Sequence, residues 1–583
     1  MTVFSSSRLI SGTDNHRALP GTCLPSGSDT STGSSASLSR IKAWLDICKS
    51  SHPACSQASS QPPPLPTRVI AVGQKRSSIC YLVSGKKKNG YYATLSHCWG
   101  GPHNRPLLTT DRTLRYRQQG IKDEVLPKTF RHAVQICRKM GIEYLWIDSL
   151  CIIQQQVSQE DWAKEAPRMG QVYGNSVLNI SAAAAADSTQ GCFQERLGLI
   201  LWPCPVILFG QTCYLSRYPT QKEEHGGDPG DLNVKLSNSL AKRAWVLQEQ
   251  VLSRRSVIFA ENRLIWRCPT LSTNEKYPLG IPHAPNISVD NHRLLYCIVN
   301  GITSLIPKEP TVDIYTCWYR LVAEFTSRDL TYNEDRLPAI AGIAQRFGVV
   351  ANDTYHARLW KNDIILGLLW HAMSRNPTFT TKSARAPSWS WASVNCGVNY
   401  SHLLSAGADA IRIPLSPLVD ILDVSDPITC EDHPFGVTSR ASLSLSGVLL
   451  ALNQDKHEQP TLALVNNGTR YADCIYDYSL DVWDFDVPDR ERLICLPVCV
   501  RHDPYHRGIR GDGELYRVSW KRSLETGTDE FERFNTLYCL ILQTVEGKQD
   551  TYSRVGMCHV GRDKTTEVSK MALFGEHRSI TII

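Results

Sequence analysis

The pattern of hydrophobic positions predicts an α/β crossover unit in the first third of the chain. Its helix carries an apolar face at helical spacing: Phe130, Ala133, Val134 and Cys137. Pro127 suits the first turn of this helix, and Gly141 suits its end. Residues 144–147 form a short apolar run, typical of a strand buried on both faces of a parallel sheet. Asp148 ends the strand, where open α/β sheets bind ligands; the alternative is that it caps the following turn.

A second strand is predicted at residues 91–95, and it runs into a turn at Gly100. Ser96, His97 and Cys98 follow directly, so small polar groups again stand at the carboxyl end of a strand. Adjacent side chains of a strand point to opposite faces, which places His97 poorly for activating either neighbour. We therefore do not expect this trio to perform nucleophilic catalysis.

A third organised unit is a helix predicted at residues 243–255, followed by strands at 256–260 and 263–268. One face of this helix carries Trp245, Gln248, Glu249 and Leu252. Buried Gln and Glu side chains are costly without partners, so this face either lines a cavity or meets cations, with Arg254 or Arg255 as candidate partners. Upstream, residues 161–173 predict a helix with a core face of Trp162, Ala166, Met169 and Tyr173.

The pattern divides the chain into blocks. Residues 1–40 are rich in Ser, Thr and Gly and predict a disordered tail. An α/β domain at 41–270 precedes a mostly helical region at 271–400, which includes a helix at 355–370, and a β-rich module at 401–583. The strands expected in this module lie at 442–452, 492–500, 515–520 and 536–545. Trp389 and Trp391 are expected to pack in a core.

Length and charge exclude several classes of protein. A chain of 583 residues requires more than one core. Its 63 basic and 56 acidic residues are scattered and give a net charge of +7, too mild and mixed to indicate a nucleic-acid partner. No apolar run is long enough to span a membrane, and the N-terminus lacks a signal peptide. We expect a cytoplasmic protein in which most of the 20 cysteines are buried, reduced thiols.

Cys48, His52 and Cys55 have the spacing of metal ligands. They supply three ligands, and no second Cys/His pair follows at a usual spacing. The sequence therefore favours the absence of a metal site, and a structural zinc stays open as the alternative.

Four segments of the α/β domain carry a recognisable signature. They are residues 92–100 (YATLSHCWG), 145–154 (LWIDSLCIIQ), 169–175 (MGQVYGN) and 243–249 (RAWVLQE). In this order they resemble the motifs of the heterokaryon incompatibility (HET) domain of filamentous fungi. The resemblance extends over residues 41–400 and makes 41–270 a HET domain, with residues 144–154 as its central strand, and 271–400 a HET-associated region. His97 departs from the family, which more often has Tyr there.

The resemblance implies an effector of fungal non-self recognition and programmed cell death, acting with an unidentified recognition protein. HET domains are regarded as distant relatives of TIR domains, which implies a flavodoxin/TIR-like parallel sheet with flanking helices. In NAD-cleaving TIR domains a catalytic glutamate follows a Trp by four residues, as Glu249 follows Trp245, although Val246 replaces the TIR cysteine and a long insertion precedes this helix. A carboxylate there stabilises the ribosyl cation without a metal.

Three functions therefore stay open. The first is an incompatibility effector without a defined biochemical output. The second is an NAD glycohydrolase without a cofactor, in which Glu249 is catalytic, Ser96 and Asp148 line the pocket, Trp245 forms a wall and NAD is the substrate. The third is a non-catalytic signalling module that self-associates through strand edges or helix faces. In both alternatives to the enzyme, Asp148 and Glu249 serve the fold.

Overall fold

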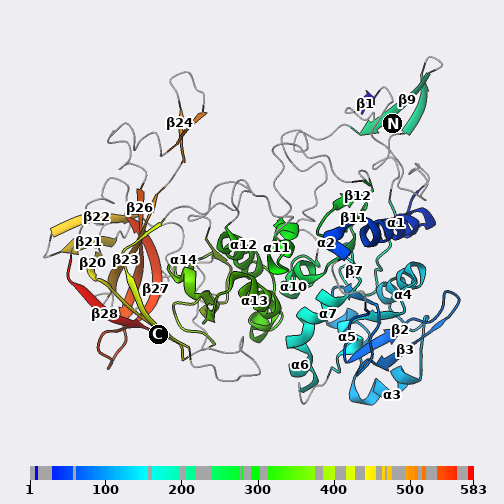
Figure 1. Ribbon diagram of the computed structural model, residues 1–583, viewed down its shortest axis with the longest axis horizontal. Coiled ribbons are helices and arrows are strands. Elements are labelled where there is room, and N and C mark those ends of the chain that lie inside the picture. The colour runs from blue at the N-terminus through cyan, green and yellow to red at the C-terminus, as the bar shows by residue number, and fades with distance from the viewer. Residues whose placement is uncertain are drawn as a thin grey trace. The chain divides into compact units, whose positions relative to one another are not determined.

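A computed structural model describes most of the chain (Figure 1). The described residues are 29–56, 61–154, 160–196, 239–275, 278–279, 291–302, 313–373, 385–400, 415–426, 440–454, 493–502, 535–560 and 575–583, with further strands at Ser7–Ile10, Cys204–Leu208, Gln211–Arg217, Leu462–Asn466, Thr469–Ile475, Tyr505–Ile509 and Leu515–Ser519. The chain forms two compact units. One comprises Met1–Ile306 and Pro338–Phe347, and the other comprises Pro307–Leu337 and Gly348–Ile583.

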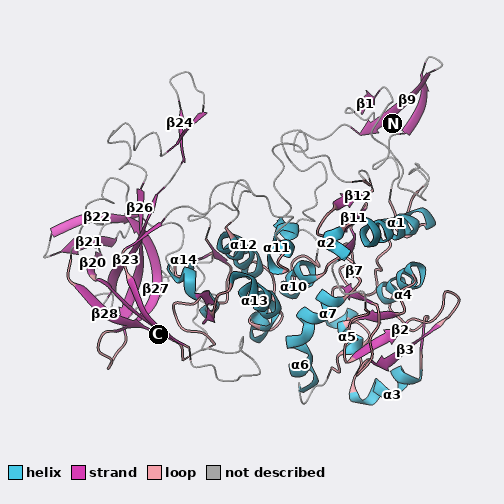
Figure 2. Cartoon of the chain, in the orientation of Figure 1, coloured by secondary structure: helices cyan, strands magenta, loops and turns pink. Residues whose placement is uncertain are grey.

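A nine-stranded mixed sheet forms the centre of the first unit (Figure 2). Its order is β12-β11-β10-β7-β4-β6-β2-β3-β5. The strands are β2 (Arg68–Ala71), β3 (Ile79–Ser84), β4 (Tyr92–Ser96), β5 (Ile121–Lys122), β6 (Tyr144–Trp146), β7 (Leu178–Ser181), β10 (Ser256–Phe259), β11 (Leu264–Arg267) and β12 (Ser272–Asn274). Strands β10, β7, β4 and β6 are parallel neighbours, and the outer strands pair antiparallel. The predicted α/β class with a parallel core is confirmed.

The middle strand of this sheet is β4, not β6 as the family resemblance implied. Strand β4 pairs in parallel on both sides, with Ala93 opposite Leu145 of β6 and Leu178 of β7. All its residues are buried. Strand β6 has a parallel partner on one side and the antiparallel strand β2 on the other. In chain order the parallel strands therefore run second, first, third and fourth across the sheet.

The predicted crossover unit is confirmed in detail. Helix α4 spans Lys128–Met140 and buries its apolar face, including Phe130 and Val134. Gly141 ends the helix in the left-handed region, with φ of 74°, and its N–H bonds the Cys137 carbonyl. Strand β6 follows, and the short helix α5 (Asp148–Cys151) begins at its carboxyl end.

The first unit contains further helices. They are α1 (Ser35–Ser51), α2 (Pro53–Ser56), α3 (Asp111–Gln119), α6 (Glu160–Glu165), α7 (Met169–Asn175), α10 (Ala244–Leu252) and α11 (Asn291–Val299), with the Pro338–Phe347 part of α13 (Pro338–Ala351). The predicted helix at 161–173 is divided into α6 and α7 by a 3-10 turn at Ala166–Arg168, which contains Pro167.

Helix α1 lies partly within the segment that the sequence predicted to be a disordered tail. It begins at Ser35, where the Ser34 hydroxyl accepts a hydrogen bond from Ser37 N–H. Thr32 and Arg40 are almost completely buried. Except for strand β1 (Ser7–Ile10), which pairs with β9 (Gln211–Arg217), residues 1–28 lie outside the described residues.

The second unit contains helices α12 (Ile314–Thr326) and α14 (Ile364–Gly367) and small sheets. The prediction of one helix over 355–370 was wrong. Strands β13 (Tyr355–His356) and β14 (Leu359–Trp360) form a hairpin whose turn residues, Ala357 and Arg358, have φ of 45° and 78°. The centroids of the paired Tyr355 and Trp360 rings lie 4.4 Å apart, so this cross-strand aromatic contact offsets the strain of the turn. Trp389 and Trp391 are buried, as expected.

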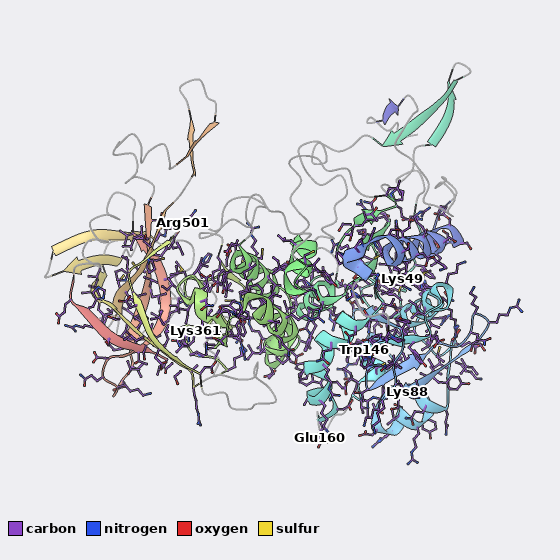
Figure 3. The ribbon with its side chains drawn as sticks, viewed as in Figure 1. Lys49, Lys88, Trp146, Glu160, Lys361 and Arg501 are labelled. Atoms are coloured by element: carbon purple, nitrogen blue, oxygen red, sulfur yellow. The ribbon has the colours of Figure 1, made fainter. Side chains whose placement is uncertain are left out.

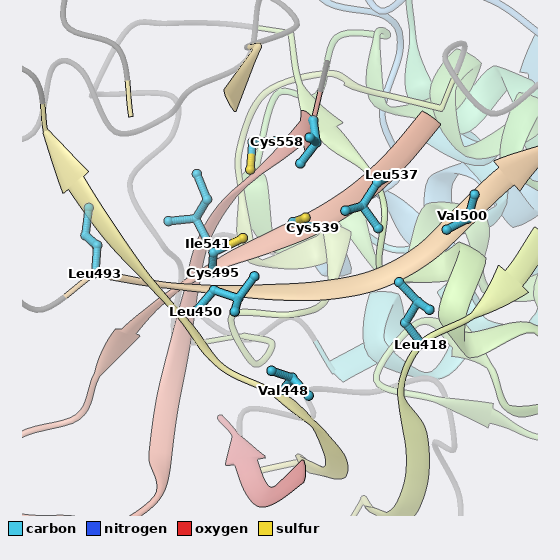
Figure 4. Close-up of a cluster of buried hydrophobic side chains, with 11 residues drawn as sticks. Leu418, Val448, Leu450, Leu493, Cys495, Val500, Leu537, Cys539, Ile541 and Cys558 are labelled. Atoms are coloured by element: carbon cyan, nitrogen blue, oxygen red, sulfur yellow. The ribbon is translucent and has the colours of Figure 1, made fainter. Parts of the chain in front are cut away.

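A ten-stranded sheet follows, and almost all its strand pairs are antiparallel. Its strands are β17 (Leu415–Pro417), β18 (Asp420–Ser425), β19 (Ser442–Val448), β20 (Leu450–Gln454), β21 (Leu462–Asn466), β22 (Thr469–Ile475), β23 (Leu493–His502), β26 (Asn535–Thr544), β27 (Thr551–Val560) and β28 (His577–Ile582). Strands β24 (Tyr505–Ile509) and β25 (Leu515–Ser519) form a separate hairpin. A hydrophobic cluster packs on β23, β26 and β27 and includes Leu537 and Ile541 (Figure 4).

Figure 3 draws the side chains of the described residues, with Lys88 and Trp146 among those labelled. Every cysteine whose side chain is described is buried and outside a disulfide. The basic residues Lys86, Lys87 and Lys88 are exposed in the turn between β3 and β4, whereas Trp146 is buried. None of the described helices is both long and apolar enough to cross a membrane.

Candidate functional site

The candidate site lies at the carboxyl ends of β4 and β6. Ser96 is the last residue of β4, and Asp148 begins α5 directly after the neighbouring strand β6. Helix α10 contributes Glu249, which is buried and interacts electrostatically with both Ser96 and Asp148. Residues far apart in the sequence therefore meet at one edge of the parallel sheet, as the rule for open α/β sheets predicts.

Asp148 holds a compact set of polar contacts. Its Oδ1 lies 3.0 Å from His97 Nε2 and accepts a 2.7 Å hydrogen bond from Ser149 N–H. Its Oδ2 accepts a 2.7 Å hydrogen bond from the Trp99 indole. Burial alone would raise the pKa of Asp148, but His97, Arg243 and the Trp99 hydrogen bond together lower it. The carboxylate is thus an ionised anchor at the edge of the site, and its bond to Ser149 N–H lies within the first turn of α5.

His97 takes part in the site through Asp148, which the sequence did not predict. The prediction that it does not activate its neighbours agrees with the contacts, because the Ser96 hydroxyl donates to Asn179 Oδ1 at 3.2 Å instead. Strand β4 ends at Ser96, so the alternation of a strand no longer governs His97, and its ring reaches Asp148.

Glu249 differs from Asp148, the other acid of the candidate site, because its pKa is raised. Its side chain is buried, and burial raises its pKa, with a further contribution from the nearby Asp148 charge. Ser96, Arg243 and Tyr173 oppose this rise. Its Oε2 has no hydrogen-bond partner among the described residues. A buried carboxylate oxygen without a partner is costly, which is typical of a group kept for binding or chemistry.

Arg243 supplies the positive charge of the site. It precedes α10, and its Nη1 donates to the His97 carbonyl. It lowers the pKa of both Asp148 and Glu249. Two carboxylates therefore share one guanidinium.

The residues of the predicted polar face of α10 make different contacts. Gln248 Oε1 accepts a 2.8 Å hydrogen bond from Gly342 N–H, so its amide joins α10 to α13. Trp245 packs edge to face on Trp162, with ring centroids 6.4 Å apart.

Tyr173, which the sequence assigned to core packing, interacts with Glu249, and its pKa lies well above the usual range because of burial and this carboxylate.

Arg254 and Arg255, the candidate partners of this face, make other contacts. Arg254 interacts with Tyr296, and Arg255 donates to Cys48 Sγ. The positive charge nearest to Glu249 therefore comes from Arg243, at the other end of α10.

A separate group of metal-ligating side chains lies in the same unit. Cys48, His52 and Cys55 meet Cys268, and their ligand atoms all lie within 4.8 Å of one another. The sequence predicted three ligands because Cys268 lies far away along the chain, just after β11.

Comparisons with known proteins agree with the position of the candidate site. Residues 92–249 match the family model described as "Heterokaryon incompatibility protein (HET)". No curated protein and no solved structure matches the chain. The matched range begins with β4 and ends at Glu249, so it contains Ser96, Asp148, Tyr173 and Arg243. Residues 92–249 are therefore similar to the HET family, and the candidate site lies within this matched range.

Proposed function

We propose that this HET-domain protein is a cytoplasmic effector of heterokaryon incompatibility, and that it acts by cleaving NAD between ribose and nicotinamide. The family match supports the first part. The observation that carries the second part is the meeting of Glu249 with Ser96, Asp148 and Tyr173 at the carboxyl edge of the parallel sheet. An enzyme needs these groups in one place, whereas a purely structural role for each residue does not require it.

The topology supports a nucleotide site at this position. The order of the parallel strands is that of the first four strands of a flavodoxin-like sheet, as a TIR-like ancestry implies. In such sheets ligands bind where the strand order reverses, between the first strand and the third. Here these strands are β4 and β7, and Ser96 and Asn179 lie on them.

The chemistry assigns a role to each side chain. Cleavage of the glycosidic bond releases neutral nicotinamide with the bonding electron pair and leaves positive charge on the ribose. The Glu249 carboxylate stabilises that charge until a water molecule adds to the ribose and loses a proton. Its raised pKa disfavours the ionised form in the empty site, and the cationic nicotinamide ring of NAD favours it again on binding. Ser96 and Asp148 line the pocket, and the contacts with His97 and Trp99 hold Asp148 in position. Trp245 forms a wall, and no metal or cofactor takes part.

Purified full-length protein tests the catalytic part. We expect the wild type to release nicotinamide from NAD, and Glu249→Gln to reduce the rate by a factor of about 100 or more. The matched control is Glu261→Gln, because Glu261 is exposed in the turn after β10 and the substitution removes the same charge. Equal rates for the wild type and Glu249→Gln would refute the role of Glu249.

A non-catalytic signalling module is the alternative outcome. In that case Glu249→Gln leaves toxicity in the host unchanged, and toxicity depends on surface residues and on protein concentration through self-association.

A further inference from the structure

The cluster of Cys48, His52, Cys55 and Cys268 has the composition and geometry of a structural zinc site. His52 Nδ1 lies 3.5 Å from Cys268 Sγ and 3.9 Å from Cys55 Sγ. Ligand atoms around a tetrahedral zinc, with bonds of about 2.0 to 2.3 Å, lie about 3.5 to 3.8 Å apart. The side chains therefore already stand close to the edges of a zinc tetrahedron, with the ring nitrogen Nδ1 directed at the thiols.

Hydrogen-bond donors surround the sulfur atoms. Arg255 Nε donates to Cys48 Sγ at 3.1 Å, and the Thr270 hydroxyl lies 3.5 Å from Cys55 Sγ. Leu271 N–H donates to Cys268 Sγ at 3.3 Å, while the carbonyl of Leu271 accepts from Cys268 N–H at 2.9 Å. Outer contacts of this kind orient metal ligands and stabilise thiolates.

The charges also balance. Three thiolates and one Zn²⁺ carry a net charge of −1, and the buried guanidinium of Arg255 supplies +1. Arg255 also donates to the Cys55 carbonyl at 2.8 Å, so it is fixed beside the cluster. A buried arginine needs such a counter-charge, which neutral thiols do not provide.

A second group of thiols in the chain lies in a hydrophobic core and serves as a comparison for the proposed zinc site. Cys495, Cys539 and Cys558 also lie within 4.8 Å of one another, on β23, β26 and β27. They belong to the hydrophobic cluster with Leu537 and Ile541 (Figure 4). This group contains three thiols and no histidine, and its surroundings are apolar, as in an ordinary core.

We propose that Cys48, His52, Cys55 and Cys268 bind one structural Zn²⁺ that joins helices α1 and α2 to the end of β11. The first three ligands precede the HET-matched residues 92–249, and Cys268 follows them. The metal therefore fastens the segment before the HET domain to the segment after it. The four ligands leave no open position, so the ion is structural, and this inference does not depend on the proposed NAD cleavage.

Metal analysis of the purified full-length chain tests this proposal. We expect about one zinc per chain, and no other metal in stoichiometric amount. Cys268→Ser should lower the zinc content to below about a tenth of an equivalent. The matched control is Cys192→Ser, which removes a buried thiol of the same unit outside the cluster and should retain the zinc.

Two further measurements keep the test decisive if Cys268→Ser fails to fold. His52→Cys converts the ligands to four thiolates and should still hold one zinc. Cobalt(II) added to the wild type after zinc removal should give the absorption bands of a tetrahedral thiolate site. Folded wild-type protein without stoichiometric zinc and without such bands would overturn the proposal. So would a Cys268→Ser variant that keeps its zinc.

Discussion

Replacing Glu275 with glutamine is expected to destabilise the first unit strongly, because Glu275 is the centre of a buried ion network. Its side chain is fully buried, and Oε1 lies 2.6 Å from Arg40 Nη1 and 3.0 Å from Arg196 Nη2. Its Oε2 accepts a 2.8 Å hydrogen bond from Leu264 N–H. The network joins α1 to the end of the sheet, so the substitution leaves two buried guanidiniums short of negative charge.

Removal of one partner of a buried ion pair costs about 3 to 5 kcal/mol. Asp29 remains 3.0 Å from Arg196 and 3.9 Å from Arg40, so part of the charge is still balanced. We therefore expect the free energy of unfolding to fall by an amount near the lower end of this range, about 3 kcal/mol, which is a factor of about 150 in the folding equilibrium. Hydrogen exchange of the α1 amides, together with urea unfolding, measures this loss in the unit concerned.

The control is Asp46→Asn on α1, the helix that carries Arg40, a partner of Glu275. Asp46 pairs with Lys42 at 2.9 Å, but both side chains are about half exposed, at 56% and 47%. An exposed pair of this kind contributes about 0.5 kcal/mol or less. If Glu275→Gln is no more destabilising than Asp46→Asn, burial does not control the strength of these ion pairs and the reasoning fails.

Two further predictions concern packing and pH. Gly342→Ala should lower the free energy of unfolding by about 1 to 3 kcal/mol, because the new Cβ would lie 2.7 Å from Gln248 Oε1 and 3.0 Å from Gly170 Cα. An unchanged urea midpoint would contradict this close approach of the helices. His132 stacks on Phe193, and burial, followed by two neighbouring cations, lowers its pKa from 6.5 to about 4. The unfolded state therefore binds more protons between these values, so unfolding free energy should rise with pH from about 4 to 6.5 and level off above. His132→Gln should flatten this rise, and an unaltered slope would contradict the assignment.

The local parts of the fold could be predicted from the sequence. Helix α4, its Gly141 end and strand β6 depend on apolar spacing and on one glycine, which a short window of sequence contains. The positions of Ser96 and Asp148 at strand ends followed from the same pattern.

The contacts that depend on distant segments could not be predicted. Cys268 completes the cysteine and histidine cluster from the far side of the HET domain, and no spacing rule connects it with Cys48. His97 was set aside by strand alternation, although β4 ends one residue before it. Tyr173 had the spacing of a core residue, and its interaction with Glu249 depends on the tertiary fold.

The prediction of a helix at 355–370 was wrong for a different reason. The composition of this segment suits a helix, but Ala357 and Arg358 adopt positive φ in a hairpin turn that the contact between the Tyr355 and Trp360 rings stabilises. A tertiary contact thus overrides the local preference, as it often does for short segments.

We propose that Glu249 gives the HET-matched region its NAD-cleaving activity. The most direct test is to express the wild type, Glu249→Gln and Glu261→Gln at equal levels in a fungal host and to measure cellular NAD together with growth. We expect the wild type and Glu261→Gln to deplete NAD and to arrest growth, and Glu249→Gln to do neither. Equal growth arrest by the wild type and Glu249→Gln, with NAD unchanged in both, would contradict the account.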